Sequence, residues 1–289
     1  MSKIKVKTSV GVIGLGFVGG SMLKSFLLNN ADASGYDKYK DGGIGSFDSM
    51  LDKDILFLAL PTLFDEERNA YNQDAIYEVC QKLQEKNFKG IIVLKSTVEP
   101  ESTNTLSIKF PKLFFIHNPE FLTARTAFTD FHSQKHIVLG KGLTASDKHC
   151  NKVATFYKEF YPDAEVSICS AIESESMKIF CNCFYASKIQ IFNEYYLLCQ
   201  KNGSDYKRIT ELMLKNGWIN PMHINVPGPD GSLSYGGACF PKDTNALLQY
   251  MKNIETPHKV LKNVIEERNE MRSLKKAVTK SEKVFTKEE

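Results

Sequence analysis

Short apolar runs alternate with amphipathic stretches along the first 170 residues of the chain. The runs expected to form strands cover residues 10–15, 33–36, 55–60, 91–95, 113–116, 136–139 and 166–170. Between them, helical spacing of apolar residues follows the first strand and recurs at 73–85, 102–108 and 145–159. This alternation predicts an α/β fold with a doubly wound parallel sheet and helices on both faces. Ligands of such sheets bind beyond the carboxyl ends of the strands.

The pattern changes to helices after residue 170. Residues 171–200 contain neither proline nor glycine and are apolar on nearly every face, which predicts a buried helix. Further helices are expected at 204–215, from Pro241, and from 257 to 271, with a long loop at 218–233. We therefore divide the chain into an α/β domain at 1–170, a helical domain at 171–275 and a frayed tail at 276–289.

Composition and charge narrow the class of protein. The 289 residues are 42% hydrophobic and 25% charged, which suits a soluble globular protein of two domains. The net charge of +3 is too small to favour nucleic acid or an anionic membrane as a partner. No apolar run approaches the roughly 20 residues of a membrane helix, and we expect no signal peptide at the amino terminus.

The seven cysteines are an odd number without paired spacing. Cys181 and Cys183 would point to different faces of their helix, so they cannot clamp a metal ion together, and no metal site is expected. These cysteines favour reduced thiols in a cytoplasmic protein.

A glycine-rich turn, Gly14-Leu15-Gly16-Phe17-Val18-Gly19, follows the first strand. In this G-x-G-x-x-G pattern the first glycine permits a tight turn, the second lets a pyrophosphate approach, and the third lets helix and strand pack closely. The amino end of the next helix, at Phe17 and Val18, then faces the phosphates. The strand–turn–helix–strand context predicts a Rossmann-like dinucleotide site.

The second strand ends at Asp37, at about the distance where an acidic residue binds the ribose hydroxyls of a dinucleotide. A carboxylate there favours NAD over NADP, because a 2′-phosphate would face it. Lys38 lies beside it and is counted with the cofactor-binding residues. The alternative interpretation of Asp37 is a solvated loop acid.

Suggestive segments follow three further strands, and they read Pro61-Thr62, Lys95-Ser96-Thr97-Val98 and Asn118-Pro119-Glu120-Phe121-Leu122. The carboxyl ends of parallel strands are where ligands bind. Each segment alone could be turn chemistry, which is the default for Pro61-Thr62.

A cysteine stands at the centre of the stretch Tyr235–Asn245, which reads YGGACFPKDTN. Gly236 and Gly237 let the backbone come close to a ligand. Proline is favoured at the first position of a helix, so a helix beginning at Pro241 would place Cys239 just ahead of its amino end.

This position would activate the Cys239 thiol. The helix dipole and the Lys242 ammonium both stabilise a thiolate, and Asp243 lies four residues on, on the same helical face. A thiolate beside a carboxylate suits covalent catalysis. The alternative is that Cys239 is a small buried hydrophobe, the commonest fate of a free cysteine.

Lys178 is out of place in the apolar stretch 171–200. Burying an unpaired ammonium costs several kcal/mol, so it needs a partner or a role. Asn182, four residues on, and Glu175, three before, share its side of the helix. The alternative is a lysine that reaches out to solvent.

These segments together resemble the UDP-glucose 6-dehydrogenase family, within the wider UDP-glucose/GDP-mannose dehydrogenases. The cysteine stretch is similar to the G-G-x-C-F-P-K-D motif, and the strand ends are similar to P-T-P, S-T-V and N-P-E-F-L in the same order. Residues 177–194 resemble the family's central helix, in which K-x-x-x-N supplies catalytic side chains, at Lys178 and Asn182 here.

The resemblance implies an NAD-dependent, four-electron oxidation of the C6 alcohol of a nucleotide sugar to the uronate. It implies that Cys239 forms a thiohemiacetal and then a thioester, and that Glu120 activates the hydrolytic water. Lys178 and Asn182 would stabilise oxyanions, which are charges that preorganised donors stabilise strongly. It places Thr97 near the nicotinamide. Asp243 is a candidate for proton handling or for orienting its neighbours.

The resemblance also implies where the substrate binds. The substrate-binding residues would be Glu120, Phe121, Leu122, Lys178, Asn182, Asn225, Gly236, Gly237 and Cys239. The loop 225–231, NVPGPDG, would be the main substrate segment. A homodimer built on the Ala171–Gln200 helix is expected, because the helix is apolar all round and the family dimerises through this region.

Three departures from the family pattern stand out, and one is a connection between Asp37 and Ile55 that is shorter than in typical members. Ala124 and Arg125 occupy the place where N-P-E-F-L usually continues to a second glutamate. Typical members also continue into a third domain that helps to hold the substrate nucleotide, and the resemblance covers only the part before it.

Three functions remain open from the sequence. The first is a UDP-glucose dehydrogenase, with GDP-mannose or another nucleotide sugar as the alternative substrate. The second is a non-catalytic nucleotide-binding remnant, against which the retained Cys239, Lys178 and Asn182 argue. The third is a two-electron hydroxyacid dehydrogenase, whose chemistry needs no nucleophilic cysteine.

Overall fold

A computed structural model describes residues 8–273 of the chain. Two compact units are present: unit 1 holds the residues up to Thr62 together with Asn72–Lys178, and unit 2 holds Leu63–Tyr71 together with the residues from Ile179 onward. The expected tail at 276–289 lies outside the described residues.

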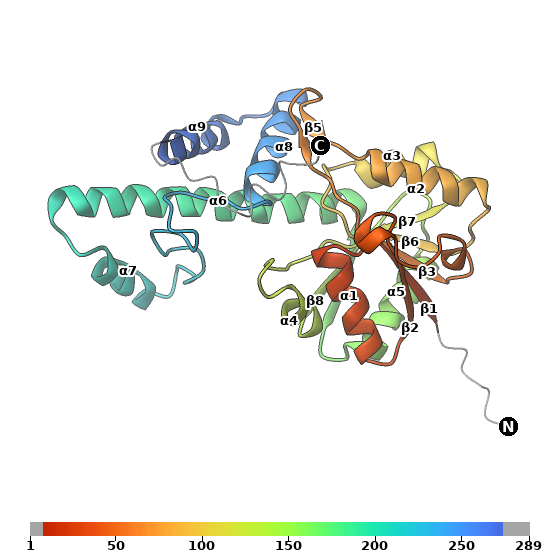
Figure 1. The fold of residues 1–289 in the computed structure, drawn as a ribbon. Helices are drawn as coiled ribbons and strands as arrows, with labels where there is room; N and C mark the ends of the chain where they lie inside the picture. The colour runs from red at the N-terminus through yellow and green to blue at the C-terminus, as the bar shows by residue number, and fades with distance from the viewer. Residues whose placement is uncertain (1–7, 274–289) are drawn as a thin grey trace. The chain divides into compact units, whose positions relative to one another are not determined.

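Unit 1 is built on a seven-stranded sheet in the order β2-β1-β3-β6-β7-β8-β9 (Figure 1). The strands are β1 (Ser9–Ile13), β2 (Asp32–Tyr36), β3 (Ile55–Leu58), β6 (Ile91–Leu94), β7 (Phe114–His117), β8 (His136–Lys141) and β9 (Glu165–Ser170). The strands β3 and β6 are fully buried, as expected for central strands covered on both faces.

Helices cover both faces of this sheet, which confirms the doubly wound prediction. One face packs against α1 (Phe17–Leu28), α4 (Ala127–His132) and α5 (Asp147–Phe160). The other packs against α2 (Asp74–Glu85) and α3 (Ser102–Lys109). Two short 3-10 helices, η1 (Lys40–Gly42) and η2 (Asp48–Met50), lie in the connection from β2 to β3.

The sheet is mostly parallel, not wholly parallel as predicted. β8 pairs with β7 in the antiparallel direction, whereas every other neighbouring pair in this sheet is parallel. The segment between β7 and β8 forms only the six-residue helix α4, which packs against α1. Because no crossover helix returns the chain along the sheet, β8 starts at the end where β7 finished and runs back.

Unit 2 is helical. It contains most of α6 (Ala171–Asn202), then α7 (Tyr206–Lys215), α8 (Phe240–Asn253) and α9 (Lys259–Ser273). A two-stranded hairpin from the first half of the chain, β4 (Phe64–Asp65) and β5 (Ala70–Tyr71), packs on α8. Tyr71, Ile179, Leu247 and Leu261 lie in one buried cluster of this unit. Neither this hairpin nor α4 is predicted by the sequence pattern.

Helix α6 is not buried on every face. The prediction of a fully buried helix, made from its apolar composition, is therefore wrong. One side is exposed and apolar, and it is formed by Phe180, Phe184, Ile191, Tyr195 and Leu198. We call these five residues the α6 stripe. Among residues 8–273, no helix combines the length and apolar character needed to cross a membrane.

Candidate active site

The turn after β1 is shaped by two glycines that no other residue could replace without a clash. Gly14 has φ of +88°, and a Cβ there would lie 2.5 Å from the Ala59 carbonyl oxygen. A Cβ on Gly19 would lie 1.8 Å from the carbonyl oxygen of Gly14. These are the tight turn and the close helix–strand packing predicted from the G-x-G-x-x-G pattern.

The second glycine of the pattern has the opposite surroundings. Gly16 is the N-cap of α1, and a Cβ on it would meet no protein atom within 4 Å. The N–H groups in the first turn of an α-helix point out of its amino end, and α1 presents this end just after Gly16. The room around Gly16 at this helix end fits a dinucleotide pyrophosphate, so the residues present suit NAD.

Asp37 follows β2, and its carboxylate binds both the glycine turn after β1 and the residues that come after Asp37 itself. Its Oδ2 accepts the N–H of Leu15 at 2.7 Å, and its Oδ1 accepts those of Tyr39 at 3.0 Å and Lys40 at 2.9 Å. Partial burial raises the pKa of Asp37. These N–H groups and the Lys40 ammonium together lower it by more, so the pKa lies below its ordinary value. Asp37 is therefore an ionised acceptor beside the glycine turn. Lys38 is exposed and pairs with Glu78 at 3.1 Å.

The segments after β3 and β6 are bonded to each other. The Ser96 hydroxyl accepts the Leu60 N–H at 3.0 Å and donates to the Leu60 carbonyl at 2.7 Å. The Thr62 hydroxyl donates to the Thr97 carbonyl at 2.6 Å. Pro61 is exposed, whereas Thr62 and Ser96 are buried. The structure thus brings these predicted cofactor residues to one edge of the sheet.

Lys178 is buried, and its partner is Glu120. The Lys178 ammonium lies 3.1 Å from Glu120 Oε1, and their side chains are 6% and 11% exposed. Glu120 Oε2 accepts the N–H of Leu122 at 2.7 Å, and Lys178 Nζ lies 5.5 Å from the centroid of the half-exposed Phe121 ring. A lysine that reaches out to solvent is therefore excluded, and two predicted catalytic residues lie together.

Glu175 is not the partner of Lys178. Its carboxylate accepts the N–H groups of Glu101 and Thr103, each at 2.7 Å, at the amino end of α3. Burial raises the pKa of Glu175 to about 7, against the lowering by these hydrogen bonds. Glu175 therefore links the first part of α6 to the amino end of α3.

Lys95 stands in one of the suggestive strand-end segments, but the sequence interpretation gave it no role in the site. Its ammonium is buried and donates to Asn118 Oδ1 and to the Pro119 carbonyl, both at 3.1 Å. Burial lowers the pKa of Lys95 to about 7, with Glu120 raising it and Lys178 lowering it. Lys95 therefore holds the turn that carries Glu120 and adds a titratable charge beside the ion pair. Its place before Ser96-Thr97 was the available signal.

In unit 2, Asp243 is the centre of a buried group of donors. Its Oδ1 accepts the Tyr71 hydroxyl at 2.5 Å and the Lys242 ammonium at 2.6 Å, and its Oδ2 accepts the Asn182 side-chain N–H at 2.5 Å. Burial raises the pKa of Asp243, but these partners, with Lys242 first, leave it below its ordinary value. An ionised carboxylate surrounded by donors suits the orienting role better than proton handling. Tyr71, from the hairpin, was missed by the sequence interpretation.

Cys239 is exposed and is the N-cap of α8. The helix begins at Phe240, one residue earlier than predicted, with Pro241 in its first turn. The cysteine therefore lies at the positive end of the helix dipole, and the alternative of a buried hydrophobe is wrong. No disulfide joins any of the seven cysteines, all of which lie within the described residues.

The glycines before Cys239 have different roles. Gly237 has φ of +75°, the left-handed conformation that favours glycine. A Cβ on Gly236 would lie 2.5–2.6 Å from three atoms of the Arg272 guanidinium. Farther back in the loop, Asn225 is exposed.

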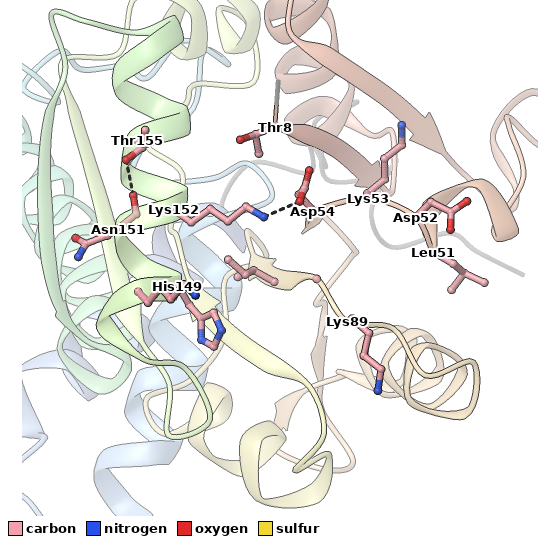
Figure 2. A pocket seen from close by; sticks show the side chains of 13 residues that line it. Thr8, Leu51, Asp52, Lys53, Asp54, Lys89, His149, Asn151, Lys152 and Thr155 are labelled. Atoms are coloured by element: carbon pink, nitrogen blue, oxygen red, sulfur yellow. Dashed lines mark hydrogen bonds and ion pairs between the residues drawn. The ribbon is translucent and has the colours of Figure 1, made fainter. Parts of the chain in front are cut away.

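A pocket at the other edge of the sheet is lined by none of the predicted site residues. It measures about 730 Å³ and lies at the amino ends of β1, β3 and β6, where Lys152 pairs with Asp54 at 2.6 Å (Figure 2). The predicted cofactor residues follow the carboxyl ends of the same strands. Within residues 8–273, no group of three or more potential ligands could hold a metal ion.

Two family models match most of the chain. The NAD-binding domain of the UDP-glucose/GDP-mannose dehydrogenase family matches residues 45–161, and the central domain of that family matches residues 172–270. The fold and the glycine turn are those of an NAD-binding dehydrogenase domain. The chain belongs to the UDP-glucose/GDP-mannose dehydrogenase family.

Among curated proteins, the chain is similar to UDP-glucose 6-dehydrogenase YwqF of Bacillus subtilis. The two are 30% identical over 230 residues, which cover 76% of this chain and 50% of that protein. A second relative, UDP-glucose 6-dehydrogenase of Campylobacter jejuni, is 29% identical over 80% of this chain and 56% of its own length. The chain thus spans about half the length of the curated relatives it matches.

Solved structures share the fold. A UDP-glucose dehydrogenase from the hyperthermophilic archaeon Pyrobaculum islandicum has a TM-score of 0.80 at 23% identity, over 93% of this chain and 70% of that one. At this identity the likeness shows the fold alone.

We predict that Lys95 makes stability depend on pH in a definite direction. Its pKa is about 7 in the folded protein and near 10.5 when unfolded, so the unfolded chain binds more protons between these values. As pH rises from 7 to 9, wild type should gain free energy of unfolding relative to Lys95→Met. Urea unfolding at several pH values measures this. The exposed Lys112→Met control should keep the wild-type slope, and a parallel slope for Lys95→Met would contradict the burial argument.

Proposed function

We propose that the chain oxidises the C6 alcohol of a nucleotide sugar to a carboxylate with NAD, and that UDP-glucose is the substrate. The observation that carries this proposal is Cys239, exposed at the N-cap of α8 within the cysteine motif. A hydroxyacid dehydrogenase would need no nucleophile there. Relatives named UDP-glucose 6-dehydrogenase support the choice of sugar, with GDP-mannose as the alternative.

The cofactor would be held by residues of unit 1. These are the Gly14–Gly19 turn with Phe17 and Val18, Asp37 and Lys38, and the strand-end residues Pro61, Thr62, Ser96 and Thr97. The chemistry that bound NAD would supply is a hydride acceptor for each of the two oxidations. The ionised Asp37 would accept bonds from the ribose hydroxyls and would repel a 2′-phosphate.

The first oxidation would remove a proton and a hydride from the C6 alcohol and leave an aldehyde. Negative charge develops on the sugar oxygen as the proton leaves. In our proposal the Lys178 ammonium and the Asn182 N–H stabilise that charge. Asp243 would act as a positioning residue, because its Oδ2 holds the Asn182 amide at 2.5 Å.

The second oxidation would proceed on Cys239. Its thiolate adds to the aldehyde carbon, and the new C–S bond gives a thiohemiacetal. Loss of the hydroxyl proton and a second hydride converts this to a thioester. Water, deprotonated by Glu120, then adds to the carbonyl, the C–S bond breaks, and the uronate and the thiol are released. Four electrons leave in all, as two hydrides.

Substrate binding would draw on Phe121 and Leu122 beside Glu120, on Asn225 in the 225–231 loop, and on Gly236 and Gly237. The reduced thiols are consistent with our prediction of a cytoplasmic enzyme.

The direct test is NADH formation with a panel of UDP-glucose, GDP-mannose and UDP-N-acetyl sugars. We expect UDP-glucose to give the highest kcat/KM. No NADH from any sugar would favour the alternative of a non-catalytic nucleotide-binding remnant.

We predict that NAD binds more tightly than NADP, because Asp37 is ionised beside the glycine turn. Fluorescence titration of both cofactors measures the two Kd values. Equal values would show that Asp37 does not bind the ribose.

We predict that Cys239→Ala spares the first oxidation more than the second, because the thiol is needed only after an aldehyde exists. With an aldehyde trap present, it should give at most one NADH per sugar and trapped aldehyde. Lys178→Ala should slow both steps, by about 10²–10³-fold for one lost oxyanion donor. The half-buried Cys181→Ala serves as the matched control. Uronate formation by Cys239→Ala at the wild-type rate would remove the cysteine from the mechanism.

We predict a homodimer in which the α6 stripe meets a second copy of the chain. The α6 stripe is a patch of five large apolar side chains, of which Phe184 is 65% and Leu198 59% exposed. Exposure of such a patch to water is unfavourable. Phe184→Glu with Leu198→Glu should give a monomer in sedimentation velocity at micromolar concentration. Gln200→Glu, exposed on the same helix, should leave the dimer intact. A monomeric wild type would contradict the prediction.

A further inference from the structure

The segment that leads into Cys239 is held by an arginine of α9. The Arg272 Nη2 donates to Asp230 Oδ2 at 2.8 Å and to the Ser234 carbonyl at 3.2 Å. The Arg272 side chain is only 10% exposed, so solvent screens this pair weakly. One guanidinium therefore joins two points of the loop that lie four residues apart.

A second arginine, one turn earlier on α9, binds the next peptide group. Arg268 Nε donates to the Tyr235 carbonyl at 3.2 Å, and its guanidinium carbon lies 5.7 Å from the Tyr235 ring centroid. Tyr235 is itself buried beside Ala186 and Val264. The carbonyl oxygens of Ser234 and Tyr235 are thus both bound from α9.

This arrangement sets the direction of two peptide planes. In a trans peptide the N–H points opposite to the carbonyl. The N–H groups of Tyr235 and Gly236 are therefore directed away from the two arginines. Three guanidinium atoms of Arg272 lie 2.5–2.6 Å from where a Cβ of Gly236 would be, so glycine is needed for this close approach.

The same segment is also held by α6. The Ser234 N–H donates to Asn193 Oδ1 at 2.8 Å, and the Ser234 hydroxyl bonds to Gln190 Oε1. Ser234 has φ of +57°, which is uncommon for a residue other than glycine and requires support from its surroundings. The loop is therefore restrained from two helices just before it reaches the cysteine.

We propose that Arg272, supported by Arg268, is a positioning residue that fixes the 230–237 segment and thereby holds the Cys239 sulfur at the N-cap of α8. The inference rests on the proposed function in taking Cys239 as the nucleophile. In this role Arg272 neither reacts nor binds substrate. It acts through Asp230, Ser234 and Gly236, which fix the path of the backbone into the cysteine motif.

The test measures thiol reactivity without substrate, so it is independent of the choice of sugar. The rate of iodoacetamide modification of Cys239 is followed by peptide mass spectrometry from pH 5.5 to 9.5. For Arg272→Ala we expect the rate at pH 7 to fall about two- to fivefold, the scale of a charge displaced from a helix terminus. Its pH profile should move upward. Arg272→Lys and Asp230→Asn should give smaller shifts in the same direction.

The control removes a different cation from the same helix. Lys262, which pairs with Glu266 and is 51% exposed, is replaced in Lys262→Ala and should label like wild type. If circular dichroism shows that Arg272→Ala is unfolded, the test is made with Arg272→Lys and Asp230→Asn. Wild-type rates and profiles in Arg272→Lys and Asp230→Asn, and in Arg272→Ala if it folds, would overturn the proposal.

A double-mutant cycle tests the contact itself. Gly236→Ala should displace the Arg272 guanidinium, so Gly236→Ala and Arg272→Ala should be strongly non-additive in the labelling rate. Additive effects would show that Arg272 does not act through Gly236. A lack of NADH from every sugar, with these labelling results intact, would count against the proposed function and leave the positioning role standing.

Discussion

Lys178 brings a positive charge into the buried beginning of α6, and the local structure of unit 1 has to satisfy it. An ammonium removed from water costs several kcal/mol unless a partner and further hydrogen bonds compensate. Glu120 supplies the opposite charge at 3.1 Å, and the Leu122 N–H binds the other oxygen of that carboxylate. Lys95 in turn holds the turn that carries Glu120, through Asn118 and the Pro119 carbonyl. A dry, paired lysine is a strong electrostatic group for a charge that develops during a reaction.

Unit 2 also contains a buried charge that needs partners, the carboxylate of Asp243. Asp243 is ionised, and the donors around it come from three elements: Tyr71 on the hairpin, Asn182 on α6 and Lys242 on α8. These bonds fix the Asn182 amide and the first turn of α8, whose N-cap is Cys239. The α9 arginines restrain the segment that precedes the cysteine. Cys239 itself is exposed, whereas Asp243, Asn182 and Tyr71 are buried.

The sequence predicted the strands of the sheet and the glycine turn because buried strands and close backbone approaches leave strong local patterns. Cys239 and Lys178 stood out because a thiol before a helix and a charge in an apolar stretch are unusual. The partners of these residues could not be predicted. Glu120 lies 58 positions before Lys178, and Tyr71 lies 172 positions before Asp243, so only the tertiary fold brings them together. The reversal of β8 was missed for a related reason, since strand direction depends on where α4 packs.

The central claim is that oxidation passes through a thioester on Cys239, and a variant that slows its hydrolysis tests this most directly. Glu120→Gln should still allow both oxidations but not activate water. Mixed with NAD and UDP-glucose and quenched with acid, it should give a burst of two NADH per active subunit. Mass spectrometry should then find one nucleotide-sugar acyl group on the Cys239 peptide. A full burst with Cys239 unmodified, or with the acyl group on another residue, would contradict the account.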